Sequence, residues 1–263
     1  MLELKNVCMT FHAGTPDENR ALKNINLKIN QGDFITVIGS NGAGKSTLMN
    51  VIAGTYRATS GEVFYDGRNV TKEPEFKRAR YIGRIFQNPL LGTAGKMSLE
   101  DNMVICSKKG SKSLKISLNN KLRAAFREQL KALDMNLENR LNDNVALLSG
   151  GQRQALTLLM AVMSKPALLL LDEHTAALDP RTAEKVLELS DKIVTENKLM
   201  TLMVTHNMRD AIRYGNRLIM MNEGKIILDI AGEEKQRLTV ENLMAAFFKA
   251  SGEEFANDRA LLS

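Results

Sequence analysis

The sequence predicts an α/β protein with a largely parallel sheet and an inserted helical subdomain. Short apolar runs with the length and composition of buried strands lie at residues 34–38, 167–171, 199–204 and 217–221. Helical patterns separate these runs, and strands that alternate with helices are typical of a parallel sheet. From residue 88 to about residue 160 the pattern is polar and helical, which predicts a subdomain between the first two buried strands.

Further elements are expected at the two ends of the chain. Residues 2–8 and 21–29 alternate apolar and polar side chains like strands, and residues 12–20 between them have the composition of a turn or loop. Near the C-terminus one helix face carries four apolar residues, Val240, Leu243, Met244 and Phe247. They predict a helix that docks on the core, while residues 252–263 are expected to fray.

The composition of the 263 residues is that of a globular protein, with 44% hydrophobic and 25% charged residues. Its two cysteines lie far apart with no CxxC, which argues against a disulfide framework or a zinc site. The longest apolar stretch is broken near Pro166, and the start has no leader pattern, so neither a membrane span nor a signal peptide is predicted. The net charge of +6 is interpreted as a solvated excess of lysine, and the 5% aromatic content predicts no nucleic-acid partner.

A Gly-rich loop, Gly39-Ser40-Asn41-Gly42-Ala43-Gly44-Lys45-Ser46, joins the first buried strand to a helical pattern at residues 46–53. Its glycines let successive backbone N–H groups wrap a phosphate, and the helix that follows adds the positive end of its dipole. Lys45 would reach the β- and γ-phosphates of a triphosphate, and Ser46 would ligate Mg²⁺. The loop therefore predicts a nucleotide triphosphate site.

An acidic pair, Asp172 and Glu173, ends the apolar run Leu168-Leu169-Leu170-Leu171. At the carboxyl end of a parallel strand these side chains face the ligand crevice. Asp172 fits an Mg²⁺ ligand, and Glu173 fits a general base that polarises the attacking water. Together with the phosphate loop they predict hydrolysis rather than binding alone.

A second helix start lies at Leu148-Ser149-Gly150-Gly151-Gln152, where Ser149 can cap the helix and two glycines let a phosphate approach. One nucleotide in a single domain does not need two such helix ends. A dimer does, if each chain offers its second helix end to the nucleotide of the other.

These residues resemble the motifs of the nucleotide-binding subunits of ATP-binding cassette (ABC) transporters, and the resemblance covers nearly the whole chain. Gly39 to Thr47 is similar to Walker A, Leu148 to Gln152 is identical to the LSGGQ signature, and Asp172-Glu173 is similar to Walker B with its catalytic glutamate. The other matches are Phe11 for the adenine-stacking aromatic residue, Gln87 for the Q loop, Asp179 for the D-loop and His206 for the switch histidine.

The resemblance implies a P-loop NTPase (RecA-like) parallel-sheet core, an inserted helical subdomain and an N-terminal antiparallel β region. It implies one domain over residues 1–263, with a catalytic core at 1–87 and 161–228, a signature subdomain at 88–160 and a helical tail at 229–263. Catalytic roles fall to Glu173, His206, Gln87 and Lys45, and Mg²⁺ ligation to Ser46, Gln87 and Asp172. ATP would contact Phe11, Gly39, Ser40, Asn41, Gly42, Ala43, Gly44, Lys45, Ser46 and Thr47 of one chain. The other chain would contribute Ser149, Gly150, Gly151, Gln152 and Asp179.

Two features depart from the family pattern or add to it. The family usually has proline after the catalytic glutamate, where this chain has His174, and we interpret the change as tolerated variation in a loop. The basic run at residues 108–115 is interpreted as a solvated loop, although its subdomain normally contacts the transporter in this family.

The function implied is that of a homodimer, or a pair with a near-homologous cassette, that powers transport through a separate membrane permease at the cytoplasmic face. Residues 14–20 and the signature stretch resemble cassettes that work with a solute-binding protein, which suggests import of an amino acid or similar small solute. The alternative is a non-transport ABC ATPase such as an Fe–S assembly ATPase, and a bare ATP-dependent regulator is a third possibility. The DNA-acting and translation-factor classes fit less well, because the chain has no sustained heptads and a single cassette.

Overall fold

The computed structural model describes residues 1–107 and 119–251, so the basic run at 108–115 and the end at 252–263 lie outside the described residues. The chain divides into two compact units. The first unit holds Met1–Ala79 together with the residues from Asn197 onward, and the second unit holds Arg80–Glu196. Each unit is described by itself below.

An antiparallel sheet in the first unit has the strand order β2-β1-β4-β5. Its strands are β1 (Leu2–Phe11), β2 (Asn19–Ile29), β4 (Ser60–Tyr65) and β5 (Arg68–Asn69). Leu4 of β1 lies opposite Leu27 of β2 and Val63 of β4, and all three side chains are buried. The alternation of the sequence thus places one face of the sheet on the core, and the predicted N-terminal antiparallel region is confirmed.

The parallel strands of the first unit are β3 (Phe34–Gly39), β8 (Met200–Val204) and β9 (Arg217–Asn222), and β3 pairs in parallel with both others. Every residue of β3 is buried, as expected for a strand covered on both faces. These strands confirm the predictions near residues 34, 199 and 217. An additional strand, β10 (Lys225–Ala231), pairs antiparallel with β9; it was not predicted, because most of its side chains are exposed or only half buried.

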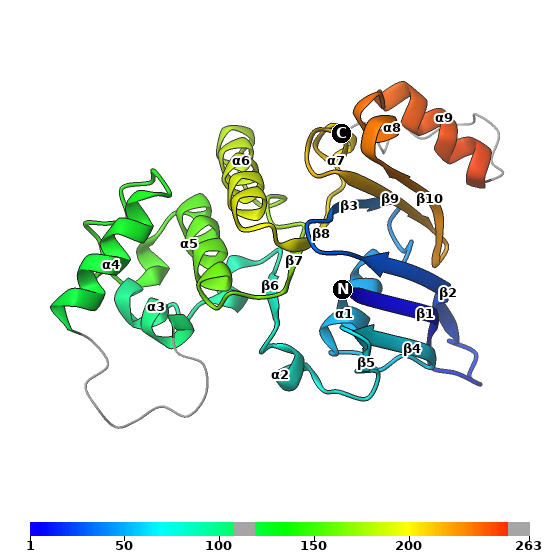
Figure 1. Cartoon of the computed structure of the whole chain (residues 1–263), viewed down its shortest axis with the longest axis horizontal. Coiled ribbons are helices and arrows are strands. Elements are labelled where there is room, and N and C mark those ends of the chain that lie inside the picture. Colours follow the sequence, from blue (N-terminus) through cyan, green and yellow to red (C-terminus); the bar gives the residue numbers. More distant parts are fainter. Residues whose placement is uncertain (108–118, 252–263) are drawn as a thin grey trace. The chain divides into compact units, whose positions relative to one another are not determined.

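Five helices complete the described part of the first unit: α1 (Lys45–Ala53), α2 (Glu75–Arg78), α7 (Met208–Arg213), α8 (Gly232–Gln236) and α9 (Val240–Ser251). Helix α9 runs beside β10 (Figure 1). Its Leu243 and Phe247 are buried in a cluster with Ile38 and Met220, which confirms the predicted docking of the tail helix.

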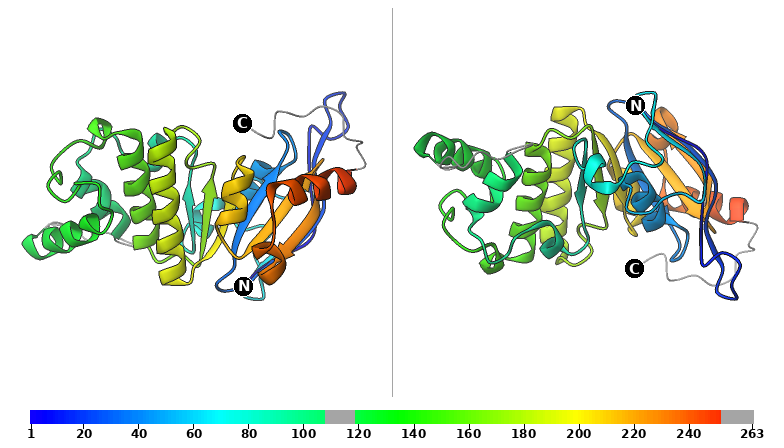
Figure 2. Two further views of the ribbon diagram at one scale, coloured as in Figure 1. Left: turned by 90° about the horizontal axis from the view of Figure 1, so that it is seen from above. Right: turned by 90° about the horizontal axis from the view of Figure 1, so that it is seen from below.

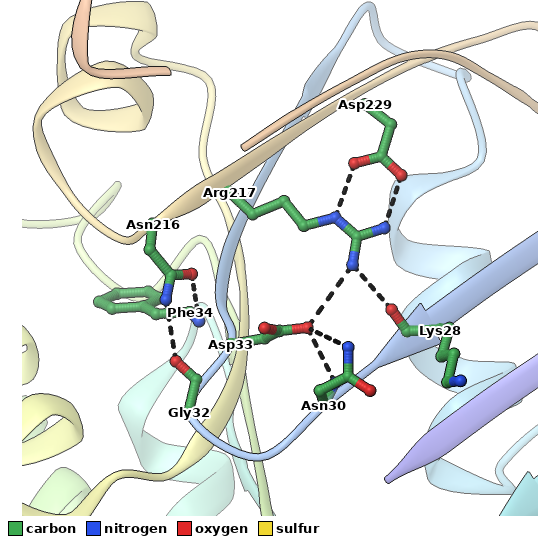
Figure 3. A network of polar contacts seen from close by, with 8 residues as sticks. All are labelled: Lys28, Asn30, Gly32, Asp33, Phe34, Asn216, Arg217 and Asp229. Atoms are coloured by element: carbon green, nitrogen blue, oxygen red, sulfur yellow. Dashed lines mark hydrogen bonds and ion pairs between the residues drawn. The ribbon is translucent and has the colours of Figure 1, made fainter. Parts of the chain in front are cut away.

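Polar contacts from β9 and β10 hold the turn between β2 and β3 (Figure 3). Arg217 bonds both carboxylate oxygens of Asp229, at 2.6 and 2.5 Å, and the backbone oxygen of Lys28 at 2.7 Å. Its guanidinium also lies 3.5 Å from Asp33, whose carboxylate accepts from the backbone N–H of Asn30. Since β3 leads directly into the Gly-rich loop, this network fixes the strand that presents the loop.

The second unit contains the parallel pair β6 (Ile82–Ile85) and β7 (Leu168–Asp172). Its longer helices are α3 (Leu99–Ser107), α4 (Asn120–Lys131), α5 (Gly150–Met163) and α6 (Pro180–Asn197), and its short turns are η1 (Pro89–Gly92) and η2 (Val145–Leu147). Helices α5 and α6 lie side by side in all views (Figures 1 and 2). Helices α3, α4 and α5 share one apolar core that includes Met103, Phe126 and Leu156.

In the described ranges of the chain, none of the helices is long and apolar enough to cross a membrane.

Candidate functional site

The Gly-rich loop turns directly from β3 into α1. Gly44 precedes the helix in the left-handed region, with φ of 99°, and no side chain caps the helix there. A Cβ on Gly44 would lie 2.5 Å from the carbonyl oxygen of Ala21, so a larger residue cannot fit without moving backbone. The first-turn N–H groups of α1 are therefore presented to an anion rather than to a capping side chain.

The Lys45 side chain folds back over this loop. It is only 5% exposed, and its ammonium donates to the carbonyl oxygens of Gly39 at 2.8 Å and Ser40 at 3.0 Å. A buried ammonium needs such oxygen partners, because burying it without a partner would cost on the order of 5 kcal/mol in lost hydration. The positive charge is thus placed at the loop before any phosphate arrives.

The remaining loop residues differ in exposure. Asn41, Gly42 and Ser46 are exposed, Ser40 and Thr47 are partly buried, and Gly39 and Ala43 are buried. The exposed hydroxyl of Ser46 lies in the first turn of α1, where a hard oxygen ligand for Mg²⁺ would be needed.

Two other predicted residues belong to the first unit. Phe11 is the last residue of β1, is partly buried, and its ring packs against Tyr56 with centroids 5.3 Å apart. His206 is exposed and follows the end of β8, just before Asn207, whose side chain caps α7.

The second unit contains the second predicted helix start, at the beginning of α5. The Ser149 hydroxyl accepts from the N–H of Gln152 at 3.3 Å, and the Gln152 side chain accepts from the N–H of Ser149 at 3.2 Å, which is a capping box. Gly150 is exposed, whereas a Cβ on Gly151 would lie 2.1 Å from the Thr182 side chain of α6. The structure thus adds a packing reason for Gly151 that sequence reasoning missed.

Asp172 lies at the carboxyl end of β7, as predicted, and is paired with Arg84 of the neighbouring strand β6. The Arg84 guanidinium lies 3.1 Å from one carboxylate oxygen of Asp172, and both side chains are largely buried. The same guanidinium stacks over the Phe86 ring, 4.7 Å from its centroid. This pair orients the acidic group that was predicted to bind Mg²⁺.

Glu173 begins a tight turn and has a left-handed backbone, with φ of 46°. The next residue, His174, is buried, and its imidazole Nε2 lies 3.0 Å from the Ser190 hydroxyl of α6. Its carbonyl oxygen accepts from the Gln154 amide at 2.6 Å. Burial lowers the pKa of His174 to about 4, so the ring is neutral at neutral pH. A left-handed backbone at Glu173, the predicted catalytic position, needs such support.

Two predicted residues of the second unit are exposed. Gln87 lies two residues after the end of β6. Asp179 precedes α6, and its side chain accepts from the backbone N–H of Thr182 at 3.1 Å. Hydrogen bonds from Thr182 lower the pKa of Asp179.

The family model for the ABC transporter matches residues 22–176. The chain belongs to the ABC transporter family. The "Tyrosine transport ATP-binding protein" of Clostridioides difficile (strain R20291) is 42% identical to this cassette over 94% of the chain and 98% of its own length. A "Putative hemin import ATP-binding protein" of Staphylococcus haemolyticus is 34% identical over 86% of this cassette and 99% of its own length.

Solved structures agree with this assignment. A dimeric ATP-binding cassette in a post-hydrolysis state, bound to ADP and Pi, is 31% identical, with a TM-score of 0.73 over 88% of this cassette and 98% of that chain. The predicted resemblance and the P-loop fold are therefore confirmed. The cassette is an ATPase coupled to transport, and it is an ATP-binding subunit of the import type of ABC transporter. The relatives named here are transport proteins, which favours transport over the Fe–S assembly alternative.

Sequence reasoning missed Arg84 and Gln154 of this cassette. Arg84 is a charged residue within the otherwise apolar strand β6, and Gln154 is a polar residue on the buried face of α5. A polar residue at a position that the periodicity assigns to the core is the signal that could have found both.

The donors available in the cassette fit Mg²⁺. Among the residues that the structure describes there is no cluster of three or more His, Cys, Asp and Glu that could form a closed metal site. Mg²⁺ is usually held by one or two carboxylates together with substrate phosphates and water. The carboxylate of Asp172 in the second unit and the hydroxyl of Ser46 in the first unit are each a donor of that kind.

Proposed function

We propose that this cassette binds MgATP at the Lys45 loop, closes as a dimer around two ATP molecules, and hydrolyses them to drive import through a separate permease. The placement of Lys45 supports this most directly, because its charge already lies over an uncapped helix start. A charge held in position before the reaction needs no reorganisation as negative charge develops on the transferred phosphate.

In this proposal the chain's own residues have distinct tasks. Ser46, Asp172 and Gln87 hold Mg²⁺, which when bound neutralises charge on the phosphate oxygens. Glu173 accepts a proton from the attacking water, and His206 contacts the γ-phosphate. Phe11 stacks on adenine, while residues Gly39 to Thr47 surround the phosphates. The motifs support these roles, and the burial of the Lys45 ammonium against the loop supports the placement of the phosphates.

The second half of each site comes from the partner chain. Ser149, Gly150, Gly151 and Gln152, with Asp179, are proposed to contact the ATP bound by the other chain. The exposure of Ser149, Gly150 and Asp179 supports this, and so does the dimeric state of the related cassette. The γ-phosphate then stabilises the closed dimer, and hydrolysis lets it open.

The cargo is proposed to be an amino acid, because the relative named for tyrosine transport is 42% identical over almost the whole chain. The partners would be an integral membrane permease and, indirectly, a solute-binding protein, with the cassette at the cytoplasmic face. Gln87 is proposed to couple the site to the permease. We propose one cassette domain with the boundaries given above.

Two experiments test the proposal. The Glu173→Gln variant should form an ATP-dependent dimer in light scattering while turning over ATP far more slowly; wild-type turnover would refute the general-base role. Wild-type activity should rise more than linearly with protein concentration, and strict proportionality down to the monomer range would refute the shared site.

For the cargo, cells that lack this chain should lose accumulation of labelled tyrosine. Wild-type protein should restore it and Lys45→Ala should not. Unchanged accumulation would exclude tyrosine, with a panel of other amino acids as the next comparison.

A further inference from the structure

Phe11 and Tyr56 form an edge-to-face pair on the surface of the first unit. Their ring planes meet at 84° and the centroids lie 5.3 Å apart, which is the arrangement that aromatic quadrupoles favour. Phe11 is partly buried and Tyr56 is 37% exposed. The pair is therefore not part of the packed core, and its removal would not open a core cavity.

The fold fixes both members of the pair. Helix α1 ends at Ala53 and is capped by Gly54, after which the N–H of Tyr56 donates to the carbonyl oxygen of Asn50 at 3.2 Å. Three residues later, the hydroxyl of Thr59 accepts from the N–H of Thr10 at 2.9 Å. The N–H of Thr59 donates to the carbonyl oxygen of Cys8, also at 2.9 Å. The segment that carries Tyr56 is thus tied to α1 at one end and to β1 at the other.

Both members of the pair lie next to elements that contact or follow the phosphate loop: Phe11 beside β2, and Tyr56 after α1. Phe11 lies opposite Asn19 in the sheet, and two residues further along β2 the carbonyl of Ala21 packs against Gly44. From the other side, α1 runs from the loop to the segment that carries Tyr56. Both rings are therefore placed by the backbone that also shapes the loop.

Phe11 has no polar group that could orient its ring, so its orientation depends on packing. After it the chain turns at His12, which has φ of 51° and is exposed. Tyr56 supplies an aromatic contact to the ring from a tethered backbone position.

We propose that Tyr56 is a positioning residue that holds the Phe11 ring in place for the nucleobase and so sets the affinity for ATP. The inference rests on the proposed contact between Phe11 and adenine. Tyr56 acts through Phe11 and has no role at the phosphates.

The test compares two probes, ATP and inorganic triphosphate, each with Mg²⁺, by titration calorimetry on the full chain. Tyr56→Ala should lower the affinity for ATP by about 2- to 10-fold, the range expected for loss of one aromatic pair. It should leave the affinity for triphosphate unchanged, raise KM for ATP and leave kcat at saturation unchanged. Tyr56→Phe should behave as wild type, because the ring rather than the hydroxyl makes the contact. Phe76→Ala, at an exposed aromatic residue of the same unit, is the matched control.

Other variants separate this inference from the proposed function. Phe11→Ala should weaken the binding of ATP but not of triphosphate. The double variant with Phe11→Ala and Tyr56→Ala should bind ATP no more weakly than Phe11→Ala alone. If Phe11→Ala binds ATP normally, the adenine contact itself is wrong and the inference falls with it. If Phe11→Ala weakens ATP binding while Tyr56→Ala does not, only the role of Tyr56 is overturned. Equal loss for both probes in Tyr56→Ala, or additive losses in the double variant, would also overturn it.

Discussion

The side-chain amide of Gln154 donates a 2.6 Å hydrogen bond to the carbonyl oxygen of His174, the residue after Glu173. The same nitrogen lies 3.3 Å from the carbonyl oxygen of Phe86, the residue before Gln87. Gln154 is only 1% exposed and lies on α5, two residues after the signature motif. One side chain from the signature helix thus contacts the backbone beside the proposed catalytic base and beside the Q loop.

Replacing Gln154 with leucine should lower kcat for ATP by about tenfold or more, because small displacements of a catalytic group cost large factors in rate. Nucleotide affinity should change little, since Gln154 does not belong to the phosphate loop. Steady-state kinetics and nucleotide titration on the folded variant provide the measurement. Thr157→Val is the matched control. Thr157 is a buried residue of the same helix, and its hydroxyl donates to the carbonyl oxygen of Arg153 within α5. A wild-type kcat in Gln154→Leu would contradict the expectation.

The pairing of Arg84 with Asp172 should be measurable as a coupling energy. Breaking one partner leaves a largely buried charge without its counterpart, so Arg84→Met should lower the free energy of unfolding by about 2 kcal/mol. The double variant with Arg84→Met and Asp172→Asn should lose less free energy of unfolding than the sum of the losses in the two single variants. Urea unfolding of the four proteins gives the coupling, and strictly additive losses would show that the two groups do not interact.

Arg78 should contribute strongly to stability. It is 2% exposed and donates to the carbonyl oxygens of Val51 and Ile52, at 2.8 and 2.7 Å, near the C-terminal end of α1. A cation there donates to carbonyls of the last turn, of which that of Val51 also accepts from the N–H of Gly54, and it faces the negative end of the helix dipole. Arg78→Met should therefore lower the free energy of unfolding by about 3 kcal/mol. The exposed neighbour Lys77→Met should change it by less than about 0.5 kcal/mol in the same urea titration.

The burial of His174 should make stability depend on pH. The pKa of His174 is lowered to about 4 in the folded protein, from 6.5, so as the pH falls the unfolded state takes up this proton first. The contribution of the neutral His174 to stability is complete above pH 6.5 and is lost as the pH falls towards 4. Between these two pH values the free energy of unfolding should fall by roughly 3 kcal/mol on this account. Urea unfolding at several pH values should show a shallower dependence for His174→Gln than for wild type. Parallel curves would mean that His174 does not set this dependence.

Much of the fold could be predicted because the periodicity is strong. The fully buried strand β3 and the helix face of Leu243 and Phe247 were both located from the pattern alone, since a buried strand and a docked helix leave distinct spacings. The strand β10 was missed because an edge strand with half-exposed side chains leaves no such signal, and its pairing with β9 depends on a hairpin.

For the site, the chemical groups could be predicted from the sequence: the Gly-rich loop, Lys45, the acidic pair and the capped signature helix. These depend on local backbone geometry and on short spacing along the chain, which a sequence displays directly. The residues that support these groups became evident only from the packing of the folded chain. Arg84 lies 88 residues from Asp172 in sequence, and Tyr56 lies 45 residues from Phe11, so no local pattern indicates either contact. Such contacts arise because strands and helices distant in sequence are packed side by side, and that arrangement is a property of the folded chain.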